Sequence, residues 1–497
     1  MNSNNSLSKV RKNKLIFLMV IFLILFFILN SGFSWETVAT GIEYQKFTLP
    51  DPNNVFVVRA SRAQLNLLID SMISQGKIRT GLETVRGMAN RYENTVNYSG
   101  ELYDVVAAIN GDFFSYSTNY PVQGQIICGN FVDRYVDYAG QAIFCWKRDG
   151  TVFVDWDIVN TGFNREYVVV NGIQYELTNL NVSRGSNELI LYTPQYDDRT
   201  YTDNSGTELI VRVDNMPLYV EQDTTGIIIE KRINQGSSFI PFDCVVISGQ
   251  GTMATPLNSA TVGDSVLIRL RVKSWGDTYV GGTQLPRDWE NAYASIGGNL
   301  WCVKEGIVPS GDWDDKPGAI IRDPRTAAAF NEDYIYFVVV DGRRLGISAG
   351  MTITELGNFC LNYLQADHAL SFDGGGSSTL VVNGVVKNQP SDDSERAVSN
   401  GLMMVLASQA PISNQFVPTM RVKAITSVNL YLGPGTNYGV VATAPQGQEG
   451  EIVDNSSNGI SANGTNWWKW KYGSTEGWSS ATYLLSLTGV ANWENYE

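Results

Sequence analysis

Short runs of β-branched and aromatic residues fill most of this chain, and polar turn residues separate them. From about residue 102 to residue 407 the runs are divided by Gly, Asn and Asp. Runs bounded in this way predict strands. Residues 55–58 and 334–340 are predicted to be buried strands of this kind. The pattern therefore indicates a mostly β body with few helices.

A helical period of apolar residues occurs in two places. In the first, apolar side chains recur at the spacing of one helix face, at Leu356, Phe359, Cys360, Tyr363 and Leu364. Thr352 and Glu355 supply a capping box directly before this stripe. A strand at residues 369–372 follows, so residues 334–372 are expected to form a strand-helix-strand unit. The second place, residues 65–73, is predicted to be a short helix.

The length of 497 residues predicts two or three domains. A polar, proline-containing stretch after residue 406 indicates a linker. We divide the chain into a signal peptide or membrane anchor at 1–34, a β-rich segment at 35–100 that packs on the next domain, a mixed-sheet domain at 101–407, a linker at 408–420 and a small all-β unit at 421–487. The expected fold class is α+β and mostly β.

The N-terminus has the pattern of an export signal. Four cations lie between residues 9 and 14, and an unbroken apolar run covers residues 15–29. Gly32-Phe33-Ser34 offers a small-x-small cleavage site, and an uncleaved membrane anchor is the alternative. We expect an extracytoplasmic protein, either secreted or held at the cell surface, that meets a membrane only if this segment stays uncleaved.

Charge and composition exclude several classes of function. The chain has 36 Lys and Arg against 50 Asp and Glu, a net charge of −14, and no basic stripe that could neutralise a nucleic acid. A single histidine, His368, excludes zinc sites built on several histidines. The five cysteines are expected to be small buried residues, with a Cys128–Cys145 bridge left open. The chemistry must come mostly from carboxylates, amides, hydroxyls and arginines.

Three segments place polar residues at strand ends beside glycines or a proline: Asn110-Gly111-Asp112, Asp323-Pro324-Arg325-Thr326 and Asp373-Gly374-Gly375-Gly376-Ser377-Ser378. Successive glycines can turn several N–H groups toward one anion, and an arginine after a rigid turn suits phosphate or carboxylate. A tight β-turn is the alternative for the glycines. A salt bridge is the alternative for Arg325 and for Arg396.

The C-terminal unit resembles the bacterial SH3-like (SH3b) domains of cell-wall enzymes. The resemblance rests on residues 428–438 with their Gly433-Pro434-Gly435 turn, and on the later Gly477-Trp478. Tyr431 departs from it, because that family usually carries arginine there. The resemblance implies a small SH3-like barrel that binds a cell-wall ligand, and a purely structural barrel is the alternative.

Residues 101–407 resemble the phosphodiester glycosidase family, whose namesake removes N-acetylglucosamine from a phosphodiester. The matching residues, in the family's order, are Asn110-Gly111-Asp112-Phe113-Phe114, Ile296-Gly297-Gly298, Asp323-Pro324-Arg325-Thr326-Ala327, Thr352 with Glu355-Leu356, Asp373 to Thr379, and Arg396 with Val398-Ser399-Asn400. Few landmarks fall between about residues 150 and 292, and Ala328 stands where glycine is commoner.

The resemblance implies a division of roles at one site. Arg325 and Arg396, with the N–H groups of Gly374, Gly375 and Gly376, would hold the phosphate, and Asp112 and Asp373 would be the catalytic carboxylates at the anomeric carbon. The remaining site residues would hold sugar hydroxyls or orient water: Asn110, Thr326, Ser377 and Ser378. No cofactor is predicted, and a structural calcium between Asp112 and Asp373 is the alternative use of those carboxylates.

Two functions from different classes follow. The first is an exported hydrolase that cleaves the glycosidic bond of sugar-1-phosphodiesters in a surface or extracellular glycan, releasing sugar and a phosphomonoester. The second is a non-catalytic envelope protein that only grips sugar phosphates. In both, Glu355 is expected to be structural because it belongs to the capping box, and His368 is expected to be a turn residue rather than a base.

Overall fold

The computed structural model describes residues 34–79, 81–135, 142–155, 166–280, 283–309 and 316–487. Except for Ser34, the export signal predicted at residues 1–34 lies outside the described residues. Across the described ranges strands far outnumber helices, which confirms the predicted mostly β fold with few helices. Nearly all strand pairs are antiparallel, and the pair β13 (Asn179–Leu180) and β14 (Leu189–Tyr192) is parallel.

A seven-stranded sheet forms one end of the molecule. In sheet order its strands are β1 (Glu36–Ala39), β2 (Ile42–Leu49), β3 (Asn53–Ser61), β24 (Tyr334–Val340), β23 (Arg325–Phe330), β25 (His368–Ser371) and β22 (Trp301–Val303). The predicted strands at 55–58, 334–340 and 369–372 are thereby confirmed. Helix α5 (Ile353–Leu364) covers one face of this sheet, and the short helix α4 (Pro317–Ile320) lies beside it.

Helix α5 forms for the reasons that its sequence predicts. The Thr352 hydroxyl accepts the Glu355 N–H at 3.1 Å, and the Glu355 carboxylate accepts the Thr352 N–H at 2.9 Å. These two bonds confirm the capping box. The apolar stripe of the helix shares one core with residues such as Val57 and Val338 of the sheet, and the helix contacts β22 and β25 directly, so the burial of this face fixes it on the sheet.

A second, five-stranded sheet packs on the other face of the first. We call it the β6–β29 sheet, and its strands in order are β27 (Val385–Val386), β26 (Leu380–Val382), β6 (Glu101–Asn110), β29 (Asn400–Gln409) and β4 (Leu67–Ile73). Side chains such as Val58 and Phe337 from the first sheet share one core with Ile109 and Met404 from the second. Helix α2 (Val85–Tyr92) packs along β6.

Strand β4 corrects the short helix predicted at residues 65–73. All seven residues of the strand are buried, and Asp70 pairs with Met403 of β29. Leu65, Leu68, Ile69 and Met72 do repeat at a helical spacing. A strand buried on both faces loses the alternation of polar and apolar residues, so periodicity alone cannot separate it from a helix.

A third sheet, the β9–β21 sheet, completes the middle of the molecule. Its strands in order are β10 (Val152–Asp155), β9 (Ile143–Lys147), β21 (Ala292–Gly297), β7 (Gln125–Ile127) and β8 (Asn130–Asp133). A two-stranded pair joins β5 (Glu83–Thr84) to β28 (Ala397–Val398). Strand β21 also contacts β4, so the β9–β21 sheet lies against the β6–β29 sheet.

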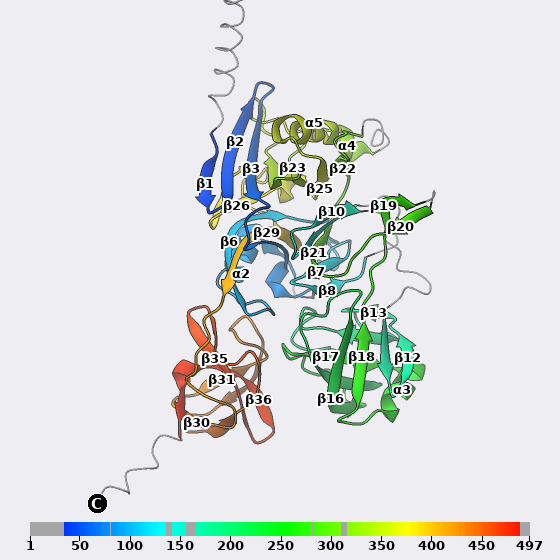
Figure 1. Cartoon of the computed structure of the whole chain (residues 1–497), viewed down its shortest axis with the longest axis vertical. Coiled ribbons are helices and arrows are strands. Elements are labelled where there is room, and N and C mark those ends of the chain that lie inside the picture. Colours follow the sequence, from blue (N-terminus) through cyan, green and yellow to red (C-terminus); the bar gives the residue numbers. More distant parts are fainter. Residues whose placement is uncertain are drawn as a thin grey trace, which may run out of the picture.

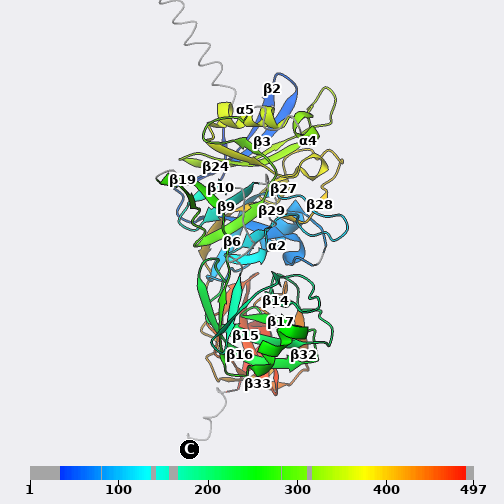
Figure 2. The ribbon, with the colours of Figure 1, turned by 90° about the vertical axis from the view of Figure 1, so that its right-hand side faces the viewer.

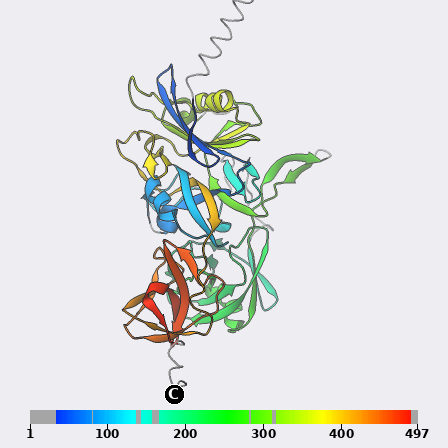
Figure 3. The ribbon, with the colours of Figure 1, turned by 60° about the vertical axis from the view of Figure 1, so that its left-hand side comes forward.

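Most of the chain between β10 and β21 forms an eight-stranded sheet of its own, the insertion sheet. Its order is β12 (Ile173–Glu176), β11 (Tyr167–Val170), β18 (Ser265–Arg269), β16 (Asp223–Ile233), β15 (Thr207–Val213), β17 (Cys244–Gly249), β14 and β13. Helix α3 (Ala254–Ser259) packs on it. The hairpin of β19 (Trp275–Val280) and β20 (Thr283–Pro286) projects from the side of the body (Figure 3).

The C-terminal residues form one further sheet. Its order is β32 (Val440–Ala444), β31 (Val428–Tyr431), β36 (Thr475–Ser480), β35 (Thr465–Tyr472), β33 (Glu449–Ile452), β30 (Arg421–Ala424) and β37 (Leu484–Ser486), with β34 (Ile460–Ala462) paired to β35. Residues between β29 and β30 are bonded on both sides, because the Ala410 N–H donates to the Gly100 carbonyl and the Ser413 N–H to that of Gly459.

The sheets are arranged in three tiers. Figures 1 and 2 show the seven-stranded sheet with α5 at one end, the β6–β29 and β9–β21 sheets in the middle, and the insertion and C-terminal sheets side by side at the other end. The last two sheets touch directly, since the Phe242 N–H donates to the Leu432 carbonyl at 3.0 Å. The middle tier therefore connects all the other parts.

Candidate active site

The polar segments singled out in the sequence lie together where three sheets meet. Strand β6 ends at Asn110 and β25 ends at Ser371, just before Asp373, while β23 begins at Arg325. The Asp373 N–H donates to the Gly111 carbonyl at 3.0 Å, which joins the first of these segments to the last. The structure thus brings together residues more than 260 positions apart.

Asn110 connects the three segments. Its Nδ2 donates to the Asp373 carbonyl at 2.7 Å, and its Oδ1 accepts the Thr326 hydroxyl at 2.7 Å and the Thr379 N–H at 3.1 Å. Asn110 and Thr326 are fully buried, and these hydrogen bonds satisfy the polar atoms of both side chains inside the protein. Asn110 and Thr326 therefore hold the segments in place in this structure.

Asp112 is a buried carboxyl at the centre of the site. Its Oδ1 accepts the Phe113 N–H at 2.7 Å and its Oδ2 accepts the Gln123 N–H at 2.6 Å. Burial raises its pKa to about 8, and the negative charge of Asp373 adds to the rise. Asp112 is therefore largely protonated at neutral pH.

Asp373 has a more polar environment. Burial raises its pKa, but a hydrogen bond from Ser377, the positive charge of Arg396 and the Gly374 N–H each lower it. One of the glycine amides is already used inside the protein, because the Gly375 N–H donates to the Pro324 carbonyl at 3.0 Å. The Gly374 N–H donates a hydrogen bond to Asp373. The amides of Gly374 and Gly375 therefore stabilise the turn in this conformation.

Two arginines lie on the glycine turn. Arg396 donates from Nε and Nη2 to Asp392 at 2.9 and 2.7 Å, and its guanidinium occupies the space where a Gly376 side chain would be. Arg343 donates to both carboxylate oxygens of Asp323 at 2.6 and 2.8 Å and lies against Gly375 in the same way. The absence of glycine side chains is what allows both cations to approach this backbone.

Arg325 is engaged elsewhere. Its Nε donates to the Met351 carbonyl at 2.7 Å, and its Nη2 donates to the carbonyls of Gly318 and Ile321 at 2.7 and 2.6 Å. The residue is buried, and burial lowers its pKa. Arg325 thus braces the loops around the site, and the neighbouring carboxylate of Asp323 is bound by Arg343.

The two serines after the glycines are both buried. Ser377 contacts Asp373 and accepts a long, 3.5 Å hydrogen bond from Arg396. The Ser378 hydroxyl is buried and has no hydrogen-bond partner among the described residues. A buried hydroxyl without a partner is costly, so Ser378 is the better placed of the two to meet a bound group.

Two site residues were missed in the sequence. Arg343 follows strand β24 in Asp341-Gly342-Arg343, which has the same strand-then-glycine pattern as the other segments and could have been found by it. Asp133, at the end of β8, has its pKa raised to about 7 by burial, and its charge raises the pKa of Asp112. Only the pairing of β8 with β7, which carries Asp133 toward Gln125, reveals its position.

Other predictions fall outside the chemistry. Glu355 belongs to the capping box and also binds Arg322 at 2.9 and 3.0 Å. His368 stacks on Phe330 with ring centroids 4.9 Å apart. All five cysteines are free and buried, which confirms their expected role and leaves no Cys128–Cys145 bridge.

No group of three or more His, Cys, Asp and Glu side chains that could hold a metal ion occurs among the residues that the structure describes. Of the helices in the described part of the chain, none combines the length and apolarity needed to cross a membrane.

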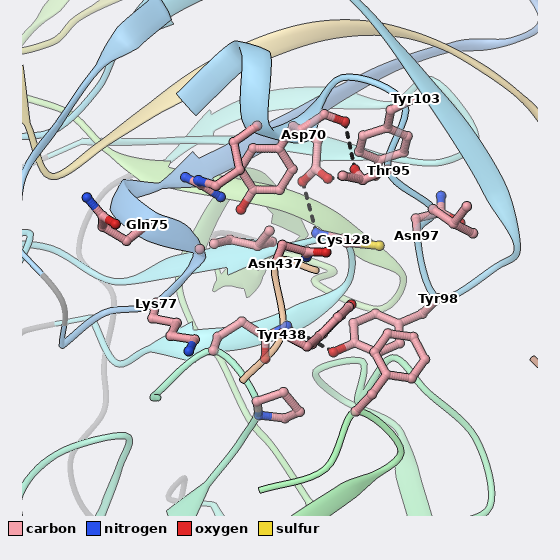
Figure 4. A pocket seen from close by; sticks show the side chains of 18 residues that line it. Asp70, Gln75, Lys77, Thr95, Asn97, Tyr98, Tyr103, Cys128, Asn437 and Tyr438 are labelled. Atoms are coloured by element: carbon pink, nitrogen blue, oxygen red, sulfur yellow. Dashed lines mark hydrogen bonds between the residues drawn. The ribbon is translucent and has the colours of Figure 1, made fainter. Parts of the chain in front are cut away.

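A cavity of about 110 Å³ lies apart from this site, where the middle tier meets the insertion and the C-terminal unit (Figure 4). Asp70 and Tyr103 line it from the β6–β29 sheet, Gln195 from the insertion and Tyr438 from the C-terminal unit. Its lining includes neither Asp112 nor Asp373, so it is a feature of domain packing rather than part of the candidate site.

One known protein family is similar to part of this chain. The phosphodiester glycosidase family model matches residues 207–405. The match contains Arg343, Asp373 and Arg396, begins inside the stretch where few landmarks were expected, and leaves out Asn110 and Asp112. A comparison with curated proteins finds no match.

Solved structures show a related fold. An uncharacterised protein from Synechocystis has a TM-score of 0.50 at 18% identity, covering 75% of this chain and 64% of its own. A Burkholderia pseudomallei protein described as exported has a TM-score of 0.48 at 19% identity, with 71% and 74% covered. The zebrafish N-acetylglucosamine-1-phosphodiester alpha-N-acetylglucosaminidase catalytic domain, auto-inhibited by its pro-peptide, has a TM-score of 0.37 at 13% identity, with 75% and 87% covered. This chain thus spans 64% of the Synechocystis structure, and its residues 207–405 are similar to the phosphodiester glycosidase family model.

Proposed function

We propose that this chain is an exported hydrolase that cleaves the glycosidic bond of sugar-1-phosphodiesters in a cell-surface or extracellular glycan. The products would be a free sugar and a phosphomonoester. The observation that carries the proposal is the joining of the buried carboxyl of Asp112 and the half-buried carboxyl of Asp373 to two arginines on one glycine turn. The family match at residues 207–405 supports the same reaction class.

The arginines are arranged to take a phosphate. Arg343 and Arg396 each hold a carboxylate, Asp323 and Asp392, and the side chains of both pairs are between 26 and 49% exposed. A phosphodiester offers the same kind of anionic oxygens as a carboxylate, so it can join or replace these carboxylates without new desolvation of the arginines. We assign phosphate binding to Arg343 and Arg396, and we assign Arg325 to positioning the loops.

The two carboxyls differ in charge, and this difference suggests their roles. Asp373 keeps negative charge more readily because Arg396, Ser377 and the Gly374 amide favour its ionised form. Asp373 would attack the anomeric carbon or activate water there. Asp112, protonated at neutral pH, would give its proton to the departing phosphate oxygen. A phosphomonoester is already a good leaving group, so this proton adds a modest acceleration.

The test is direct turnover. The protein is incubated with a panel of sugar-1-phosphodiesters, and free sugar and new phosphomonoester are followed together by proton and phosphorus NMR. Equal amounts of both are expected, and Asp373→Asn should abolish their release. Asp149→Asn, at an exposed turn of the described chain, is the matched control. Wild-type release by the double variant Asp112→Asn, Asp373→Asn would refute the proposal.

The alternative is an envelope protein that binds sugar phosphates without cleaving them. The same NMR experiment separates the two functions, because a binder shifts protein resonances without releasing phosphomonoester. If none of the phosphodiesters turns over and several bind, the non-catalytic function replaces the hydrolase.

The C-terminal unit is proposed to be an SH3-like module that binds a cell-wall ligand. The supporting observation is a cleft of about 640 Å³ between this unit and the insertion sheet, lined by Tyr431, Phe239 and Arg232 among others. An aromatic and polar lining suits sugar rings. Sedimentation with purified cell wall should fall for Tyr431→Ala and stay unchanged for Tyr483→Ala, a change at an exposed tyrosine outside the cleft.

A further inference from the structure

A rigid turn with an apolar tip lies directly beside the proposed phosphate site. The Arg344 N–H donates to the Ser348 carbonyl at 3.0 Å, and the Ser348 N–H donates back at 2.9 Å, which closes the turn. The Ser348 hydroxyl donates to the Asp341 carbonyl at 2.6 Å, and Arg344 is held by the Pro390 carbonyl at 2.9 Å. The turn is therefore fixed at both ends, and the side chains at its tip stay exposed.

The tip exposes two large aliphatic side chains. Leu345 is fully exposed and Ile347 is 57% exposed. Ile320, the last residue of α4, and Ile321, the residue after it, are 54 and 58% exposed. We call these four residues the aliphatic rim. One exposed leucine would be ordinary, but four exposed aliphatic side chains on two segments that are both fixed to the site backbone offer an apolar surface suited to an apolar contact.

The aliphatic rim belongs to the margin of the site. Arg343, two residues before Leu345, lies on Gly375 and binds Asp323. The Ile321 carbonyl accepts a hydrogen bond from Arg325, which also holds the Met351 carbonyl. Both rim segments are therefore fixed to the same backbone that carries the arginines. A group leaving the phosphate on the side away from the sugar would pass along this margin.

We infer that the substrate is a lipid-linked sugar phosphate, in which the phosphate joins the sugar to a long hydrocarbon chain, and that the aliphatic rim contacts the membrane that holds this chain. The inference rests on the proposed function and adds its substrate class. The rim arginines Arg322, Arg343 and Arg344 are each paired with an acidic residue, so contact should depend on apolar burial rather than on anionic lipid.

The position of the chain's start agrees with this orientation. The apolar run at residues 15–29 precedes β1, which belongs to the seven-stranded sheet that also contains β23 and β24. The turn at the rim is bonded to the β2–β3 hairpin of that sheet, since the Ala349 N–H donates to the Pro52 carbonyl at 2.8 Å. An export signal kept as an anchor would therefore bring this end of the molecule, with α4 and α5, to the membrane (Figure 1).

The first test places a probe at the rim of the full chain. All five native cysteines are buried, so Leu345→Cys can be labelled selectively with a fluorophore. Ile173→Cys is the matched control, because Ile173 is also 57% exposed but lies in β12 at the other end of the molecule. On phosphatidylcholine vesicles with nitroxide-labelled acyl chains, quenching is expected at position 345 and not at 173. Equal or absent quenching at 345 overturns the inference.

The second test compares two esters of the same sugar-1-phosphate, one with a methyl and one with a dodecyl group. Leu345→Ser with Ile347→Ser is expected to lower kcat/KM for the dodecyl ester about tenfold and to leave the methyl ester unchanged. Ile173→Ser should change neither. Equal kcat/KM for both esters in every variant overturns the lipid-linked substrate while keeping the hydrolase. If neither ester turns over, the proposed function fails, and the quenching result alone decides whether the aliphatic rim contacts a membrane.

Discussion

At the scale of single residues, burial gives chemically identical carboxyls different properties. Asp112 and Asp373 adjoin the same backbone, yet Asp373 has the positive charge of Arg396 near it, whereas Asp112 is more deeply buried and has the negative charges of Asp373 and Asp133 near it. Asp112 therefore holds its proton to a higher pH than an ordinary carboxyl. Separation of two carboxyls in this way is a general means of providing an acid and a base in one site.

This separation predicts the pH dependence of the reaction. Because the pKa of Asp112 is raised to about 8, its proton is available below that pH and is lost above it. The wild-type kcat/KM should therefore fall above about pH 8. In Asp112→Asn the rate should drop by roughly ten- to a hundredfold, and the fall near pH 8 should disappear. Rates measured from pH 5 to 10 check both; a variant that keeps the fall would assign it to another group.

Asp70 predicts an effect of pH on stability. Burial raises its pKa from 3.8 to about 7, so the folded protein holds a proton that the unfolded chain releases. The stability from this group is complete below about pH 4 and decreases as pH rises to about 7. Asp70→Asn should remove this decrease, on the order of 4 kcal/mol between pH 4 and 8. Urea unfolding at several pH values measures it, and parallel curves for both proteins would contradict it.

At the scale of elements, the glycine turn between β25 and β26 sets the position of Arg396. A side chain at Gly376 would meet the guanidinium of Arg396 and the carboxylate of Asp392. Both are ends of side chains that can move, so the turn should survive the change while the arginine is displaced. A side chain at Gly376 should therefore change the position of Arg396 more than it changes the stability of the fold.

Gly376→Ala tests this separation. It should raise KM about tenfold or more by displacing Arg396, while the melting temperature changes little. Gly318→Ala is the control, because a side chain there meets nothing within 4 Å and Gly318 also has an ordinary backbone conformation. KM and thermal unfolding are measured for both. A large fall in the melting temperature of Gly376→Ala would show that the turn is structural first.

How much of each element could be predicted depends on its surroundings. Helix α5 and strands β3 and β24 follow from local signals, namely a capping box, an apolar stripe and β-branched runs. Strand β4 does not, because burial on both faces comes from partners far along the chain. The same applies to the site: Asp112 and Asp373 are visible in motifs, whereas Asp133 and the bracing bonds of Arg325 depend on pairing that only the fold supplies.

At the scale of the whole molecule, the C-terminal unit is fixed to the body by a network of charges. Lys469 of β35 is nearly buried and binds Asp243 of the insertion at 3.0 Å and Glu476 at 2.8 Å. Arg212 of β15 binds Glu476 at 2.9 Å from the other side. Aromatic contact between Phe242 and Tyr438, with ring centroids 5.5 Å apart, extends the interface. The unit is therefore docked rather than tethered, and its cleft has a fixed orientation to the rest of the chain.

This docking predicts a coupling between the C-terminal unit and the insertion. Asp243→Asn leaves the buried ammonium of Lys469 with one carboxylate in place of two, which should lower the free energy of unfolding by about 2 kcal/mol and cause the C-terminal unit to melt separately. Glu449→Gln, in the exposed pair with Arg421, should cost less than about 0.5 kcal/mol.

The charge of Lys469 lowers the pKa of Asp243 below its ordinary 3.8, so the difference from wild type should be present above about pH 4 and vanish as the pH falls through that lowered value. Calorimetry of both variants at pH 7 and pH 3 measures these effects, and a single unchanged transition in Asp243→Asn at pH 7 would show that the apolar contacts alone hold the two sheets together.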